Sequence, residues 1–269
     1  MKKHFLAAVA VTSIVGFGAL TGSARAQSIG LNFVGTNGDS SDTLAPTQSA
    51  GVVAQTNWNN LTSVGSATSG MTTGPVFDNN AAPTPVTATW VYGANTWDNS
   101  KSSGVNPLTT NGDQVLNNGG IWGATGRAPA PAVTVSGIPY TSYSVIVTSL
   151  TDHAGSIVKT TLGGTSFYAN QTQNPQDPGY IDGTSPAFTY TQSTDTTGAG
   201  TPGGDYARFD GLTGPTFTVS EDVLPGSNST AADFSSIQII NTGSVIPEPA
   251  SLALLGLGGF GLLARRRAR

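Results

Sequence analysis

The chain has 269 residues, of which only 10% are charged, with no cysteine and a formal net charge of −4. This length allows one large domain or two small ones with a sizeable core. The acidic balance excludes a basic nucleic-acid-binding protein, so we expect no nucleic-acid partner. The lack of cysteine excludes a disulfide scaffold, cysteine-ligated zinc and a cysteine nucleophile.

The first 26 residues have the three parts of a Sec-type signal peptide. Two lysines follow the initiator methionine, residues 5–20 form an apolar run, and Ala24 and Ala26 frame a small-residue cleavage site. We expect signal peptidase to cut after Ala26, which leaves Gln27 as the first residue of the mature chain. The Sec translocon and signal peptidase are therefore expected partners.

The mature region is more acidic than the whole chain. Residues 27–246 contain four lysines and arginines against fourteen aspartates and glutamates, a net charge of −10. Such a charge favours solubility and disfavours binding to acidic polymers.

Apolar residues alternate with polar ones in many short stretches of this region. The stretches are Ile29, Leu31 and Phe33; Val86, Ala88, Trp90 and Tyr92; Val133 and Val135; Phe188 and Tyr190; Phe217 and Val219; and Ile237 and Ile239. A period of two predicts half-buried antiparallel strands, and the apolar run 145–147 predicts a central strand. No amphipathic helix of useful length is expected.

About ten such strands, separated by turns rich in glycine, proline and asparagine, predict an all-β fold. We expect an antiparallel β-sandwich or jelly-roll-like domain over residues 27–243, flanked by the signal peptide and a short C-terminal hydrophobic helix. Its N-terminal half is looser, and residues 37–73 suggest long loops or irregular edge strands. Asn37-Gly38, Asn111-Gly112 and Asn118-Gly119 predict turns with positive φ.

Two tryptophans are candidate ligand-binding residues. Trp58 and Trp97 have polar neighbours that suit a loop platform for stacking on sugar rings, although burial is common for tryptophan. Trp90 alternates with apolar residues and is expected in the core. Residues 208–214 (RFDGLTG), the following Thr-Phe-Thr-Val strand and residues 236–240 (SIQII) loosely resemble the closing hairpins of carbohydrate-binding and galactose-binding-like sandwiches. A carbohydrate-binding module is therefore one alternative function.

A structural calcium ion is the one cofactor that the residues suggest. Asp195, Asp205 and Asp210 bracket a glycine-rich loop, and calcium prefers oxygen ligands. The alternative is that these aspartates are solvated and cap turns.

Catalytic residues are not expected. His153 is the only histidine after the signal peptide, and no G-x-S-x-G elbow accompanies it, which disfavours a Ser-His-Asp triad. A glycosidase needs two carboxylates across a cleft, and the many aspartates make some pair inevitable. A secreted glycan hydrolase is therefore a second alternative, without a specific pair to support it.

The C-terminal segment 244–269 has three parts of its own. Pro247, Glu248 and Pro249 precede an uncharged apolar stretch, residues 250–264, and the chain then ends in four arginines: Arg265, Arg266, Arg267 and Arg269. As a helix the stretch spans roughly 22 Å, short of a ~30 Å hydrocarbon core, a gap that bilayer thinning can cover. The arginines act as a cytoplasmic membrane stop and leave the preceding domain on the outer side.

These three parts resemble the PEP-CTERM sorting signal of Gram-negative bacteria, a segment also described as the C-terminal domain of ice-binding proteins. The resemblance implies that an exosortase recognises Pro247, Glu248 and Pro249 and processes the tail. It implies export, transient anchoring in the inner membrane, and then release or attachment at the cell surface. A plain C-terminal membrane anchor is the alternative. The expected function is that of a non-enzymatic surface or extracellular-matrix protein of a biofilm, with exopolysaccharide as a partner.

Overall fold

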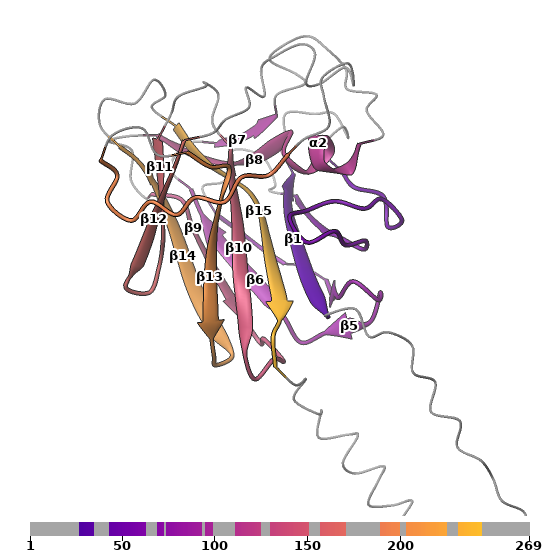
Figure 1. Cartoon of the computed structure of the whole chain (residues 1–269). Helices are drawn as coiled ribbons and strands as arrows, with labels where there is room; N and C mark the ends of the chain where they lie inside the picture. The colour runs from indigo at the N-terminus through magenta and orange to yellow at the C-terminus, as the bar shows by residue number, and fades with distance from the viewer. Residues whose placement is uncertain are drawn as a thin grey trace, which may run out of the picture.

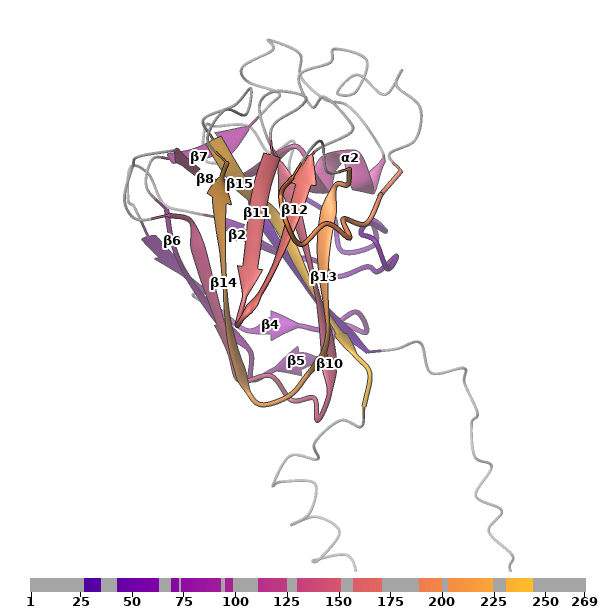
Figure 2. The same cartoon turned by 60° about the vertical axis from the view of Figure 1, so that its left-hand side comes forward.

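The computed structural model describes residues 27–34, 43–62, 69–72, 74–92, 95–98, 111–124, 130–150, 157–170, 189–199, 203–224 and 231–243. They form two β-sheets that pack face to face (Figures 1 and 2). One sheet has seven strands, the other has six, and a two-stranded hairpin accompanies them. The prediction of an all-β, sandwich-like fold is confirmed.

The seven-stranded sheet is built around two long strands. Its order is β13 (Tyr206–Leu212), β10 (Tyr143–Leu150), β15 (Ala231–Asn241), β1 (Ser28–Val34) and β2 (Asn59–Thr62), while β8 (Gly119–Ala124) pairs with the first part of β15 and with β7 (Asn95–Asp98). Neighbours are antiparallel except β1 and β2, which are parallel. The central position predicted for residues 145–147 is confirmed, because β10 lies between β13 and β15.

The six-stranded sheet is antiparallel throughout. Its order is β12 (Thr165–Asn170), β11 (Ile157–Leu162), β14 (Thr216–Val223), β9 (Ala132–Ser136), β6 (Thr87–Val91) and β3 (Ser69–Met71). The hairpin consists of β4 (Val76–Phe77) and β5 (Pro83–Thr84), and the short helix α2 spans Gly112–Leu116. Residues 37–73, predicted as long loops or irregular edge strands, thus supply β2 and β3, which are short edge strands of the two sheets.

The core lies between the two sheets. The inward residues of β1, β6, β9, β14 and β15 that the alternation predicted are all buried there. Trp90 is 2% exposed and packs edge-to-face against Phe33, with ring centroids 5.7 Å apart. Trp90 is therefore a core residue, as its apolar neighbours predicted.

The outer faces of β1 and β15 are also buried, which the alternation did not predict. A segment from the stretch 43–58 covers them: Gln238 donates to the Val53 carbonyl at 2.8 Å and accepts from the Val53 amide at 3.2 Å. A Cβ atom on Gly30 would lie 2.5 Å from the Trp58 ring. Gly30 leaves room for this covering segment, Gln238 hydrogen-bonds to it, and the outward side chain of Ile240 packs with Val52 and Val53.

Three local predictions were wrong. Asn111 does not form a turn with positive φ: its φ is −75°, and it caps α2 by accepting from the Asp113 amide at 3.0 Å. Asn118 and Gly119 do not have positive φ either, and Gly119 is the first residue of β8. Tyr190 lies outside the described strands, and its ring instead packs edge-on against Tyr206. Asn37, Gly38 and Phe188 lie outside the described residues.

The first and the last described segments of the chain lie side by side. The Asn241 amide donates to the Gln27 carbonyl at 2.9 Å, and the start of β1 and the end of β15 lie together at the lower end of Figure 1. Within the described part of the chain, no helix is long and apolar enough to cross a membrane. The expected signal peptide, residues 1–26, and the apolar stretch 250–264 lie outside that part.

Candidate functional site

A groove runs along the side of the sandwich where β2 ends one sheet and β3 ends the other. It consists of three hollows of about 350, 290 and 260 Å³, here called the central, hairpin and sheet-face hollows. The central and hairpin hollows share Trp58, Asn59, Asn60 and Phe77, and the central and sheet-face hollows share Met71 and Trp90. We call the three together the edge groove.

The side chain of Asn59 fixes the wall between the first two hollows. Its amide nitrogen donates to the carbonyls of Phe77 (2.8 Å) and Gly30 (2.9 Å), and its oxygen accepts from the Phe77 amide (2.8 Å). The side chain of Asn59 therefore attaches the hairpin β4–β5 to the seven-stranded sheet, as backbone hydrogen bonds between paired strands would. The Phe77 side chain is held with 37% of its surface exposed.

The turn of the hairpin is held by a buried carboxylate. Asp78 is 1% exposed and accepts from the amides of Asn80 and Ala82, both at 2.9 Å. Ala81 between them has a φ of +61°, and Asn57, which also lines the hairpin hollow, has a φ of +55°. A non-glycine residue with positive φ costs on the order of 1–2 kcal/mol. The surrounding hydrogen bonds must therefore stabilise this wall of the groove enough to offset that cost.

The edge groove is neutral and partly apolar. In the part of the chain that the structure describes, no lysine, arginine, histidine, aspartate or glutamate lines any of its three hollows. Among the described residues, the large hydrophobic side chains that stand exposed are Met71 (62%), Phe77 (37%) and Val91 (38%), and all three line this groove. A concave, uncharged surface with apolar side chains beside amides and hydroxyls suits a neutral ligand.

The structure gives the predicted tryptophan platform a different role. Trp58 is 5% exposed, its indole nitrogen donates to the Ala50 carbonyl at 3.2 Å, and it packs with Leu44 and Leu116. A ring that stacks on a sugar needs an exposed face, so Trp58 supports the groove from behind and does not serve as a platform. Trp97 lies in β7, and its side chain is outside the described part of the structure.

The structure does not bring the three candidate calcium ligands together. Asp195 accepts from the Thr197 and Gly198 amides, and these hydrogen bonds hold its carboxyl pKa below the usual value. Asp205 is 3% exposed and accepts from the Thr191 amide at 2.9 Å. In the described ranges, no group of three or more metal-binding side chains is suitably placed for a metal ion.

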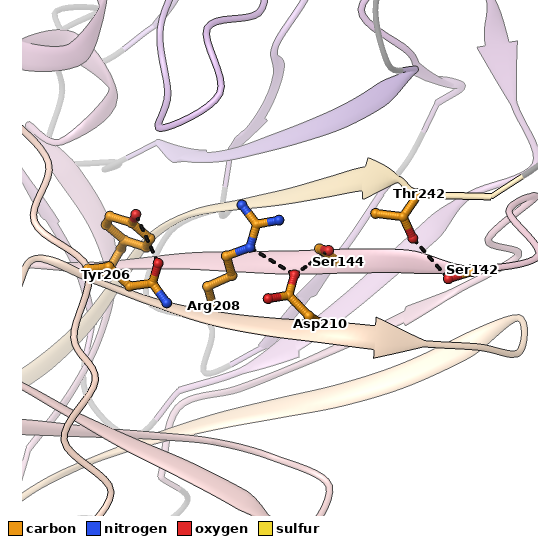
Figure 3. Close-up of polar contacts among 7 residues, drawn as sticks. Ser142, Ser144, Tyr206, Arg208, Asp210 and Thr242 are labelled. Carbon is orange, nitrogen blue, oxygen red and sulfur yellow. Dashed lines mark hydrogen bonds and ion pairs between the residues drawn. The ribbon is translucent and has the colours of Figure 1, made fainter.

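Asp210 lies on the outer face of the seven-stranded sheet (Figure 3). Its Oδ1 accepts from the Ser144 hydroxyl at 2.5 Å and from Arg208 Nε at 2.8 Å. The hydrogen bond from Ser144, together with the contacts to Arg208, lowers the pKa of this carboxyl. The carboxylate thus has protein partners that explain its position.

One buried carboxyl was missed by the sequence analysis. Glu221 of β14 is 0% exposed, and its Oε1 accepts hydrogen bonds from Ser149 of the opposite sheet and from Thr160 (3.1 Å). Its Oε2 has no hydrogen-bond partner in the described part of the structure, and burial raises the pKa of this carboxyl to about 8. A signal was present, because Glu221 falls in the same phase as the inward residues Phe217 and Val219.

Met71 and Phe77 were also missed, because each is a single apolar residue in a polar stretch without periodicity. The groove that these two residues line exists only because the edge strands of two different sheets, β2 and β3, lie near each other and near β4. His153 lies outside the described residues, as do Ala24, Ala26, the Pro-Glu-Pro motif and the terminal arginines.

A family model for the PEP-CTERM protein-sorting motif matches residues 245–267. The chain therefore carries a PEP-CTERM motif at its C-terminus, which confirms the resemblance. The motif implies a secreted, cell-surface-directed protein that is processed by an exosortase. No curated protein and no solved structure matches the chain significantly.

Proposed function

We propose that this protein is a non-catalytic component of the bacterial surface or extracellular matrix, associated with exopolysaccharide. The observation that carries the proposal is a PEP-CTERM motif that directly follows a β-sandwich ending at residue 243. In this proposal the tail anchors transiently in the inner membrane through residues 250–264, and exosortase processing at residues 247–249 then transfers the folded sandwich outward.

Support for a binding role comes from the edge groove. Among the described residues, the exposed large hydrophobic side chains are concentrated in one neutral, concave place, although the mature region has a net charge of −10. A purely structural protein without a ligand would have no need to gather exposed apolar side chains in one place. A carbohydrate-binding module that uses Phe77 and Met71 is therefore the second candidate, and it is compatible with the first.

A secreted glycan hydrolase has less support. Hydrolysis of a glycosidic bond normally uses two carboxyl groups that flank the substrate, and none of the described residues that line the edge groove has a carboxylate. Glu221 has the raised pKa of a general acid, but it is fully buried between the sheets. We also propose that no cofactor is needed, since the aspartates considered for calcium accept hydrogen bonds from the protein itself.

The test of sorting is deletion of residues 247–269, with the full chain and a Glu248→Gln variant expressed beside it in the native host. We expect the full chain in the surface and matrix fraction and the deletion variant in the periplasm or medium. Glu248→Gln removes the charge of the motif but keeps the apolar stretch and the arginines, so it separates recognition from anchoring. If both variants reach the surface fraction as the full chain does, the sorting proposal is wrong.

A further inference from the structure

We propose that the edge groove binds an extended chain of a neutral polysaccharide, with its three hollows taking successive stretches of the polymer. This inference deepens the proposed association with exopolysaccharide and rests on it. It assigns the contact to Phe77 and Met71 and excludes Trp58 as the stacking residue.

The hollows and the ridges between them alternate along the groove. Phe77 lines both the hairpin hollow and the central hollow, and Met71 lines both the central hollow and the sheet-face hollow, so each side chain lies where two hollows adjoin. Both ridges are exposed apolar side chains, at 37% and 62%. A surface that repeats hollow, apolar ridge and hollow suits a ligand that itself repeats, and a single small molecule would occupy only one of these volumes.

Charge selects the kind of polymer. An anionic chain would meet the net negative field of the domain, and the described lining residues include no cation that would compensate for it. A neutral sugar can place its C–H faces against Phe77, Met71 and Val91 while its hydroxyls stay hydrated at the open rim.

Hydroxyl groups at the rim add a polar partner. Thr72 lines the central hollow, and its Oγ1 accepts from the Ala88 amide at 3.3 Å, a hydrogen bond that does not use the hydroxyl proton. Thr89 and Thr134 are directly opposite each other across β6 and β9 and both line the sheet-face hollow, where the Thr134 hydroxyl also lies 2.8 Å from that of Thr218. A hydroxyl both donates and accepts, so a row of them can follow the hydroxyls of a sugar chain without a charged group.

An extended peptide is a less suitable occupant. A peptide that adds to a sheet needs a free edge of several residues, whereas β3 has three residues and β2 has four. The groove wall is also rigid, because Asn59 and Asp78 hold it through several hydrogen bonds. A preformed surface lowers the cost of binding a semi-rigid polymer.

The experiment is affinity electrophoresis of the full chain, purified in a non-ionic detergent. The native gels contain dextran, galactomannan or hydroxyethyl cellulose as neutral polymers, or alginate as the anionic one. We expect retardation by at least one neutral polymer and none by alginate. Met71→Ser and Phe77→Ser should each weaken the apparent affinity for that polymer about tenfold or more.

Ile157→Ser is the matched control. Ile157 is a half-buried aliphatic residue of β11, which lies near the edge of the six-stranded sheet opposite to β3. This substitution should leave the retardation unchanged, and thermal unfolding should show that all three variants remain folded. No retardation by any neutral polymer, equal retardation by alginate, or equal loss in the control would overturn the proposal. So would a concentration-dependent dimer that Met71→Ser dissociates, since the groove would then bind a second copy. Surface sorting that still depends on residues 247–269 would leave the sorting proposal standing in any of these cases.

Discussion

At the scale of single residues, Glu221 makes the stability of the sandwich depend on pH. Its folded pKa of about 8 lies above its ordinary value of 4.5, so between these values the folded chain keeps a proton that the unfolded chain has lost. The free energy of unfolding should therefore fall as pH rises through this window, by roughly 1.4 kcal/mol per pH unit for this one group. Urea unfolding at pH 5, 6, 7 and 8 measures this slope.

Glu221→Gln keeps the size of the side chain and its acceptor oxygen for Ser149 and Thr160 but cannot ionise. We expect the variant to lack that part of the slope and to be more stable than the wild type above pH 7. Asp195→Asn is the control, since the lowered pKa of Asp195 confines its effect to acid pH, where its contribution is lost as pH falls. Equal slopes in wild type and Glu221→Gln would show that Glu221 does not titrate as its burial requires.

At the scale of elements, Asn59 is what joins the hairpin β4–β5 to β2. Asn59→Leu removes three hydrogen bonds and should destabilise the hairpin by about 1–3 kcal/mol. Hydrogen exchange should become faster at the Phe77 amide and in residues 74–84, while β10 and β15 keep their protection. Asn80→Ala, at an exposed asparagine of the same hairpin, should not change exchange at Phe77. A variant that loses protection throughout the sandwich would contradict this local role.

The strands themselves could be predicted because each carries its own alternation. Residues 86–92 and 217–219 have the period, and their inward residues are buried as that period requires. The outer faces of β1 and β15 could not be predicted, since the segment that covers Gly30 and Gln238 comes from elsewhere in the chain and has no period. The edge groove could not be predicted either, because it forms only where β2, β3 and β4 meet. These strands have two to four residues each, too few to show a period in the sequence.

At the scale of the whole molecule, the last hydrogen bonds of the β-sandwich are made before the sorting motif begins. The amides of Thr242 and Gly243 donate to the Ser142 carbonyl, and the hydroxyls of Ser142 and Thr242 lie 2.9 Å apart (Figure 3). The family match starts two residues later, at residue 245. The fold and the sorting motif are therefore consecutive along the chain, and processing at residues 247–249 would leave every strand of the sandwich intact.

A chain that ends at Gly243 should consequently keep the stability of the full chain within about 0.5 kcal/mol in urea unfolding, as expected when only groups outside the packed structure change. A chain that ends at Ser235 should not fold, because it lacks the part of β15 that pairs with both β1 and β10. The pair of truncations separates loss of the tail from loss of a central strand. If ending the chain at Gly243 cost more than about 2 kcal/mol, the tail would be part of the fold, and release by an exosortase would have to destabilise the protein that it delivers.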